Sequence, residues 1–302
     1  MTTLFRVLAV VVAIYCAIAA RDCIAEVGAI SLVSPSMPDT LASTVTFRSV
    51  QSSTEADSPA LSLTSAGKPH WLSVGIDSWI GGRVKTYDLP LAVAFTPSLL
   101  AQLDIPLVTA TTDSYTAGRK TETGLGDIVF SLKYLSVVED MFESYYIFSA
   151  KFASGATETG LGTGSTDFSF THKTILMLGD YRTTLMVGVT IPPPTSVLIQ
   201  GSSVEYAPTI SYMAATERRL SNTALRFGLK AAGLHAFNSR VNSELQQNGV
   251  TTLDIIPEVT YHLSDAAMIK TGIIIPALTL YDLPGATNSR GPIVDLNVQW
   301  FF

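Results

Sequence analysis

Charge is scarce in this sequence. Charged residues make up 15% of the 302 residues, against roughly 25% in an average soluble domain. The 19 Lys and Arg and the 25 Asp and Glu give a net charge of -6, and no stretch carries a basic cluster. Binding to a phosphate backbone needs such a cluster, so nucleic acid is excluded as a partner. Because 47% of the residues are hydrophobic, the chain is too apolar to be disordered, and something other than water is expected to cover part of its surface.

Long apolar runs are also missing. Beyond residue 20 the sequence has no run of the roughly 20 apolar residues that a membrane-spanning helix needs. The longest stretch without a charge, residues 183–204, is interrupted by Pro192-Pro193-Pro194 and is rich in Gly, Ser and Thr. Proline breaks a helix because it removes a backbone donor and clashes with the preceding turn. A helical membrane protein is therefore excluded.

Residues that bind metals or cofactors are few. The sequence has two cysteines, and its four histidines lie far apart, at His70, His172, His235 and His262. No pair has the spacing of ligands to one metal ion, so we expect no metal site. Gly160, Gly162 and Gly164 are spaced like a phosphate-binding loop, but the residues after them alternate like a strand and provide no helix N-terminus for an anion. We therefore expect no cofactor.

Residues 1–19 have the pattern of a secretory signal peptide. Arg6 supplies a positive charge, residues 7–20 are apolar, and Ala17-Ile18-Ala19 provides the small residues that a signal peptidase reads. A membrane anchor is the alternative, but this apolar run is too short to span a bilayer. Cleavage near Ala19 leaves Cys23 as the one cysteine, so we expect an exported protein without a disulfide.

Residues 70–302 show strict alternation of apolar and polar residues, in segments of about ten residues separated by turn signals. The pattern is clearest in residues 292–302. It predicts twelve strands, at approximately 71–80, 89–95, 98–108, 124–135, 144–153, 164–175, 181–191, 202–214, 223–233, 251–263, 266–277 and 292–302.

Charged residues all fall on the face of these strands opposite to the apolar face. They are Asp77, Asp104, Asp127, Lys133, Lys151, Asp167, Lys173, Arg182, Glu205, Arg226, Lys230, Asp254, Glu258, Lys270 and Asp295. In a soluble β-sandwich this face would meet solvent, whereas in a membrane β-barrel it would line the lumen. The alternation alone does not separate these two folds.

Two further patterns favour the membrane barrel. The connections alternate between short turns and long polar loops, as in outer-membrane barrels with short periplasmic turns. The apolar face also carries aromatic residues at the strand ends assigned to the periplasmic side, which predicts a girdle at the membrane interface. Its members are Phe95, Tyr134, Tyr146, Tyr181, Tyr212, Tyr261, Trp300 and Phe302. We therefore predict an all-β fold, a closed antiparallel up-and-down transmembrane β-barrel of about twelve strands, because only closure pairs every backbone group in lipid.

Residues 20–69, between the signal peptide and the barrel, are rich in Ser, Thr and Ala. This N-terminal segment would either fold into the lumen as a plug or form a periplasmic linker. Our hypothesis is the plug.

Three short motifs carry a family resemblance. The last segment, ending in Phe302, resembles the C-terminal signal of bacterial outer-membrane barrels, which implies recognition by the barrel-assembly machinery. Two further segments have a Gly-rich start followed by an aspartate, which is Asp127 in residues 123–134 and Asp167 in residues 162–168. Both are similar to segments of the outer-membrane transporter family named for the meta-pathway of phenol degradation. That resemblance implies a barrel that carries small, often aromatic compounds, and it assigns no substrate residues. From the residues alone, the two Gly-Asp motifs are best interpreted as structural markers of hairpins.

The sequence thus predicts a channel in the outer membrane of a Gram-negative bacterium, surrounded by lipid, for passive passage of small apolar or aromatic solutes. A structural or adhesive barrel that conducts nothing is the first alternative. The second is an enzyme that modifies membrane lipids, since His262-Leu263-Ser264 has the spacing of a His-x-Ser pair. Its histidine is predicted to face the lumen, and no third residue can be assembled to orient it, so we expect no enzyme.

Overall fold

The computed structural model describes residues 72–80, 84–114, 118–139, 141–159, 161–194, 196–199, 202–220, 224–246, 249–264, 267–281 and 292–301. The predicted signal peptide, the Ser/Thr-rich segment 20–69 and Phe302 lie outside these residues. Within the described part of the chain, no helix is long and apolar enough to cross a membrane.

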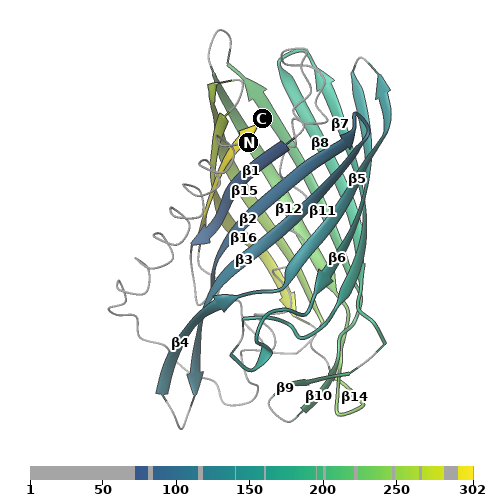
Figure 1. Cartoon of the computed structure of the whole chain (residues 1–302), viewed down its shortest axis with the longest axis vertical. Coiled ribbons are helices and arrows are strands. Elements are labelled where there is room, and N and C mark those ends of the chain that lie inside the picture. The colour runs from purple at the N-terminus through teal and green to yellow at the C-terminus, as the bar shows by residue number, and fades with distance from the viewer. Residues whose placement is uncertain are drawn as a thin grey trace.

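Twelve antiparallel strands form the wall of a closed barrel, as the alternation predicts (Figure 1). Each strand pairs with its neighbours, and the ring closes where the last strand pairs with the first, from Ser73 opposite Phe301 to Ile80 opposite Val294. In ring order the strands are β1 (Leu72–Ile80), β2 (Val84–Thr96), β3 (Leu99–Ser114), β5 (Ile128–Glu139), β6 (Phe142–Phe152), β7 (Asp167–Leu178), β8 (Tyr181–Ile191), β11 (Thr209–Arg219), β12 (Leu225–Ala236), β15 (Val250–Ser264), β16 (Ala267–Tyr281) and β17 (Ile293–Phe301).

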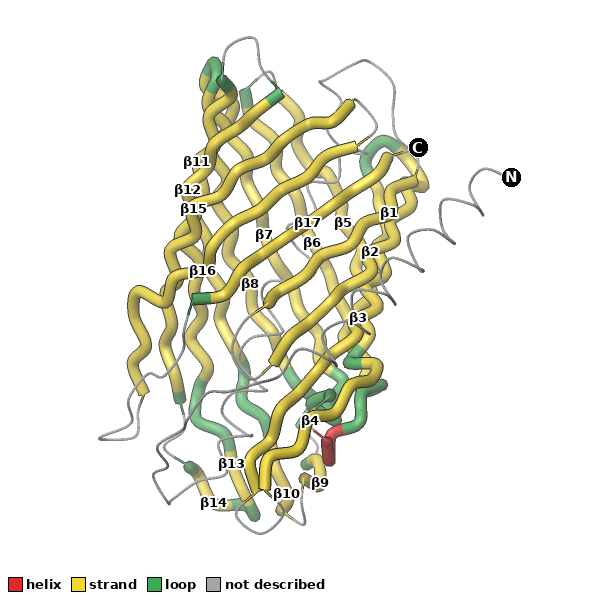
Figure 2. Tube along the Cα trace, turned by 90° about the vertical axis from the view of Figure 1, so that its left-hand side faces the viewer, coloured by secondary structure: helices red, strands yellow, loops and turns green. Residues whose placement is uncertain are grey.

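The two ends of the barrel differ. At one end, here called the turn end, the strands are joined by short connections such as residues 97–98 and 179–180, and the chain finishes beside them. The other, the loop end, carries the remaining elements (Figures 1 and 2). They are β4 (Gly118–Leu125), which extends β3 as a hairpin, the short helix η1 (Thr157–Thr159), and a four-stranded sheet of β9 (Val197–Ile199), β10 (Ser202–Glu205), β13 (Arg240–Val241) and β14 (Glu244–Leu245).

One predicted strand, residues 202–214, is divided in the structure. β10 belongs to the small sheet at the loop end, and the wall strand β11 begins only at Thr209. Pro208 stands between them, and proline cannot donate to a sheet ladder. Glu205 therefore lies outside the barrel wall, and its prediction as a lumen residue is wrong.

Strand faces have opposite character along the wall. In β6, Tyr146, Phe148 and Phe152 are exposed, whereas the intervening Ser149 and Lys151 are buried. Other strands present exposed apolar side chains to the outside in the same way, including Phe95, Phe130, Tyr134, Phe168, Phe170, Tyr181, Leu185, Val187, Phe227, Leu229, Tyr261, Ile273, Ile275 and Val294. A continuous apolar outer surface is what a barrel in lipid requires.

Tyr212 has a different place from the one predicted. It lies three residues from the loop end of β11 and seven from the turn end, so it is not part of an aromatic girdle at the turn end. Its ring lies over Gly233 of the neighbouring strand, and its hydroxyl donates to the carbonyl oxygen of Thr252, 2.9 Å away. A tyrosine that spans two strand neighbours in this way fastens β11, β12 and β15 together.

We expect Gly233→Ala to destabilise the barrel. The added Cβ would sit 2.7 Å from Tyr212 Cε2 and would also press on the Thr252 carbonyl oxygen, which belongs to the rigid backbone. Overpacking of this kind costs about 1–3 kcal/mol. Denaturant unfolding in detergent micelles measures the loss, with Ala231→Val on the same outward face as the matched control. Equal stability of the two variants would contradict the role assigned to Tyr212.

Candidate functional site

The inward face of the barrel gathers most of the charged residues that the alternation selects. Eight of them are buried: Asp104, Asp127, Lys133, Lys151, Lys173, Lys230, Asp254 and Glu258. Five more are partly buried: Asp167, Arg182, Arg226, Lys270 and Asp295. Asp77 stands in register with Asp88 of β2, while the exposed pair of Glu205 and Arg240 lies in the small sheet at the loop end.

Three buried acids were missed by the sequence prediction: Asp88, Glu143 and Glu217. Asp88 and Glu143 each precede a predicted strand start by one residue, and Glu217 lies three residues beyond a predicted strand end. The real strands are longer than the predicted ones. Extending the alternation by one residue before each predicted strand start would have found Asp88 and Glu143.

A ladder of ion pairs crosses five neighbouring strands near the turn end. Glu217 lies 4.0 Å from Arg182, 3.8 Å from Arg226 and 3.6 Å from Lys270. Glu258 lies 3.1 Å from Lys270 and 3.9 Å from Lys230. Lys270 therefore joins the two carboxylates, and the ladder holds β8, β11, β12, β15 and β16 together from the inside.

A second polar chain occupies β3 and β5. The Gln102 amide donates to Asp104 Oδ1 at 2.6 Å and accepts from Lys133 Nζ at 2.7 Å. All three side chains are buried. The amide thus bridges the lysine and the aspartate in one buried polar network.

Apolar residues form part of the interior as well. One cluster of buried inward side chains, here called the apolar belt, contains Met186, Met213, Ala232, Ile256 and Ile274, with Ile293 packed against it. A second cluster contains Ala92, Ala94, Leu100, Leu135, Tyr145 and Ile175, with Met177 packed against it. The sequence prediction missed both clusters, because it assigned one polar and one apolar parity to each strand.

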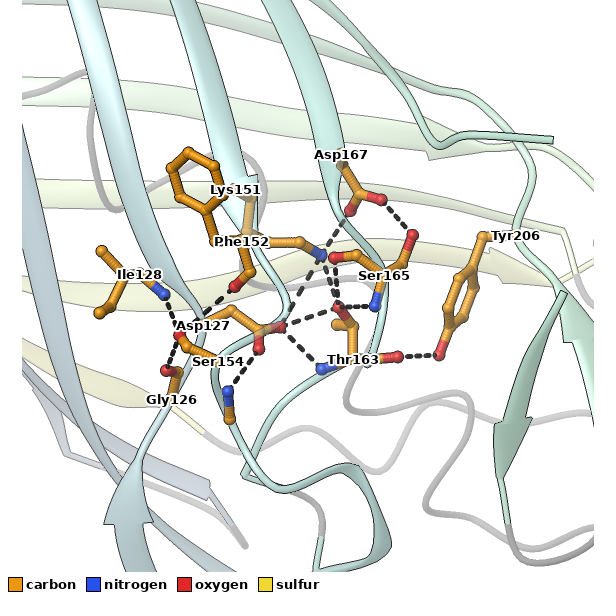
Figure 3. A network of polar contacts seen from close by, with 11 residues as sticks. Gly126, Asp127, Ile128, Lys151, Phe152, Ser154, Thr163, Ser165, Asp167 and Tyr206 are labelled. Carbon is orange, nitrogen blue, oxygen red and sulfur yellow. Dashed lines mark hydrogen bonds and ion pairs between the residues drawn. The ribbon is translucent and has the colours of Figure 1, made fainter. Parts of the chain in front are cut away.

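The connection between β6 and β7, residues 153–166, turns inward at the loop end. Leu161, Gly162, Thr163 and Ser165 are buried there. Asp127 binds this loop by accepting the backbone N–H of Gly155 at 3.0 Å, the backbone N–H of Thr163 at 2.7 Å and the Thr163 hydroxyl at 2.8 Å (Figure 3). The two Gly-Asp motifs are thus brought together in one network.

Lys151 and Asp167 complete this network. Lys151 Nζ donates to Thr163 Oγ1 at 2.7 Å, forms an ion pair with Asp167 and lies 4.0 Å from Asp127 Oδ2. The Ser165 hydroxyl donates to Asp167 Oδ1 at 2.6 Å. Two carboxylates therefore share one ammonium group, and each also binds the loop (Figure 3).

Tyr206 approaches the same loop from the far side (Figure 3). Its hydroxyl donates to the Thr163 carbonyl oxygen at 2.9 Å. Burial, with the Asp167 and Asp127 carboxylates nearby, raises the pKa of the Tyr206 phenol well above its ordinary value. The hydroxyl therefore stays protonated and keeps donating across the physiological pH range.

The aromatic residues of the predicted interfacial girdle differ in how exposed their side chains are. Phe95, Tyr134, Tyr146, Tyr181 and Tyr261 are exposed on the outside of the barrel. Trp300 is partly buried against Val74, Tyr87 and Leu89.

A serine and a histidine meet on the outer face, which the sequence prediction did not foresee. Ser144 Oγ lies 2.9 Å from His172 Nε2, and Tyr146 stacks on the imidazole with ring centroids 5.1 Å apart. A nucleophile of a hydrolase needs an orienting group on its base and access to substrate. Ser144 is only 5% exposed, and no contact with an acid is seen for His172 in the described part of the chain. His262, the histidine of the pair at residues 262–264, is partly buried.

Metal binding has no candidate among the described residues, since no three His, Cys, Asp or Glu side chains gather there in a suitable way. The inward face presents charge pairs, hydrogen bonds and apolar contacts.

Comparison with solved structures shows which fold this is. The COG4313 outer membrane channel from Pseudomonas putida F1 superposes with a TM-score of 0.61 at 10% identity, covering 78% of this chain and 97% of that one. The KdgM porin and the NanC porin give TM-scores of 0.47 and 0.46 at 8% and 11% identity, covering 76% of this chain and 99% and 98% of theirs. The superposition on the COG4313 channel, together with the closed ring of strands, shows that the chain has the fold of outer-membrane β-barrels.

Sequence comparison adds no family. No family model matches the chain, and no curated protein matches it. The resemblance to the transporter family named for phenol degradation therefore stays a prediction.

The ion-pair ladder yields a testable difference between buried and exposed pairs. We expect Glu258→Gln to lower the free energy of unfolding by about 3 kcal/mol, because it removes the carboxylate paired with buried Lys230 and one of the two carboxylates paired with Lys270. Glu205→Gln removes an exposed pair with Arg240 and should cost less than about 1 kcal/mol. Unfolding by denaturant in micelles measures both.

The double variant Glu258→Gln with Lys230→Met completes a thermodynamic cycle. Removing both partners leaves less uncompensated charge, so the double variant should be more stable than the sum of the two single losses predicts. Strict additivity would show that Glu258 and Lys230 do not interact.

Proposed function

We propose that this protein is a passive channel in the outer membrane of a Gram-negative bacterium, for small solutes that have an apolar or aromatic body. In this proposal the turn end faces the periplasm and the loop end faces outward. The apolar belt carries the proposal, because six adjacent strands of the wall place Met, Ile and Ala side chains together on the inward face, among the charged residues. A path built for sugars or ions would have polar groups there.

Two further observations support this function. A solved structure with a similar fold, that of the COG4313 protein from Pseudomonas putida F1, is itself an outer membrane channel. The motifs at residues 123–134 and 162–168 resemble those of a family of outer-membrane transporters of aromatic compounds, and the structure brings both motifs to the loop end of the barrel. Lipid around the apolar outer face and small solutes inside are the partners that follow.

The alternatives have less support. Catalysis at Ser144 would need an accessible hydroxyl and an oriented base, and its burial opposes this. Against a purely structural barrel stands the COG4313 structure of similar fold, which is an outer membrane channel. We therefore propose transport without chemistry.

Solute entry into liposomes that contain the refolded protein tests the function. Small aromatic acids should enter faster than sugars of similar size, and faster than into protein-free liposomes. Met186→Gln with Met213→Gln makes the apolar belt polar at nearly constant side-chain volume, so aromatic entry should fall severalfold while sugar entry does not.

Met141→Gln is the matched control, since Met141 is exposed in the turn between β5 and β6. It should leave both rates unchanged. If the folded wild-type protein admits neither class of solute, the channel function is wrong and a structural role takes its place.

A further inference from the structure

The inward-turned connection at residues 153–166, here called the mouth loop, packs inside the loop end of the barrel, where Leu161, Gly162, Thr163 and Ser165 are buried. On one side, Leu161 packs with Val108 and Ala110 of β3. On the other, Thr163 accepts the hydroxyl of Tyr206, which lies three residues before β11. In ring order β3 and β11 are separated by five steps in a barrel of twelve strands. β6 and β7, which carry the loop, lie between them in that order, so the loop bends inward and contacts residues on both sides of its own hairpin.

The mouth loop is held by Asp127 at two separate points. The carboxylate accepts backbone N–H groups of Gly155 and Thr163, which lie at the two ends of the loop. Asp127 is thus the side chain that joins the two ends of the loop to each other. A carboxylate that accepts three hydrogen bonds is a strong anchor, because charge-assisted hydrogen bonds are about twice as strong as neutral ones.

Close packing at Gly162 adds to the specificity of this anchor. A Cβ at this position would lie 2.7 Å from Gly155 Cα and would overlap the Asp127 carboxylate. The loop can approach Asp127 only because residue 162 has no side chain. Ser154 fixes the start of the same loop, since its hydroxyl donates to the Gly126 carbonyl oxygen at 2.8 Å and accepts the Ile128 N–H at 2.9 Å.

We propose that the mouth loop sets the size limit of the channel and that Asp127 is the residue that positions it. This inference rests on the proposed channel function and assigns its size selection to the loop end, separate from the apolar belt. Solutes pass beside the loop while Asp127 holds it, and larger solutes enter when the anchor is removed. The paired Lys151 and Asp167 restrain the loop from the β7 side.

Single-channel conductance and exclusion of neutral polymers of graded size test this inference. Asp127→Asn keeps the side-chain volume but weakens the three hydrogen bonds that this side chain accepts from the loop. Gly162→Ala changes the loop instead, because the added Cβ overlaps the Asp127 carboxylate and pushes the loop away from it. Both variants should raise the polymer size limit. The single-channel conductance should rise about two-fold if the released loop frees an area equal to half of the opening. Hydrogen exchange at the Thr163 amide should become faster in Asp127→Asn, because that amide loses its charged acceptor.

Asp180→Asn is the control, because Asp180 is an exposed carboxylate in the turn between β7 and β8. It should match the wild type in conductance and in size limit. Circular dichroism and thermal unfolding establish that each variant is folded.

The outcomes separate the two proposals. A conducting wild type with an unchanged size limit in both loop variants overturns the role of the mouth loop and leaves the channel function intact. A folded wild type that conducts nothing, together with variants that conduct nothing, overturns the channel function. Faster exchange at Thr163 without any change in size limit also overturns the proposal, since it shows a released loop that does not restrict passage.

Discussion

Backbone hydrogen bonding in a medium without water is the constraint on which this structure depends. Hydrocarbon offers no partner to a free N–H or C=O group, so strands in a membrane must pair on both edges. The pairing of β17 with β1 meets this condition for the ring. Closure then determines which kind of side chain suits each face, because one face of every strand meets the outside and the other must fit a limited interior. Phe148 outside and Ser149 inside, on successive residues of β6, follow directly.

Alternation with a period of two was enough to predict the strands, their number and the faces of most side chains. It was less reliable at strand ends, because the end of a strand depends on its partner as well as on its own residues. The extension of β3 beyond the barrel exists because β4 pairs with it, and the early start of β11 was misplaced because the residues before Pro208 pair with a different sheet. Glu205 was misassigned for this reason, and Glu217 was missed.

The interior contacts were beyond reach of the sequence for a second reason. The position of a residue in the alternation predicts which face of the strand it occupies, but not which residues contact one another across the interior. The bond between Asp127 and the Thr163 amide joins residues 36 positions apart and depends on the path of a loop. The Gly-Asp motifs were the one available signal, and their interpretation as hairpin markers overlooked the fact that a carboxylate at a strand entrance can bind the next loop. Apolar inward residues such as Met213 carry no signal at all, since they break the parity from which the faces are inferred.

The arrangement of charges explains why apolar contact and size, more than charge, are expected to select solutes. Glu217 and Glu258 already have cationic partners within 4.0 Å, so their fields are largely compensated within the ladder itself. A solute would have to displace a buried partner to gain an ion pair, and that exchange costs as much desolvation as it returns. The ladder therefore acts as a rigid inner frame near the turn end. In the proposed channel, discrimination between solutes falls to surfaces that need no exchange of partners, which are the apolar belt on one wall and the mouth loop at the loop end.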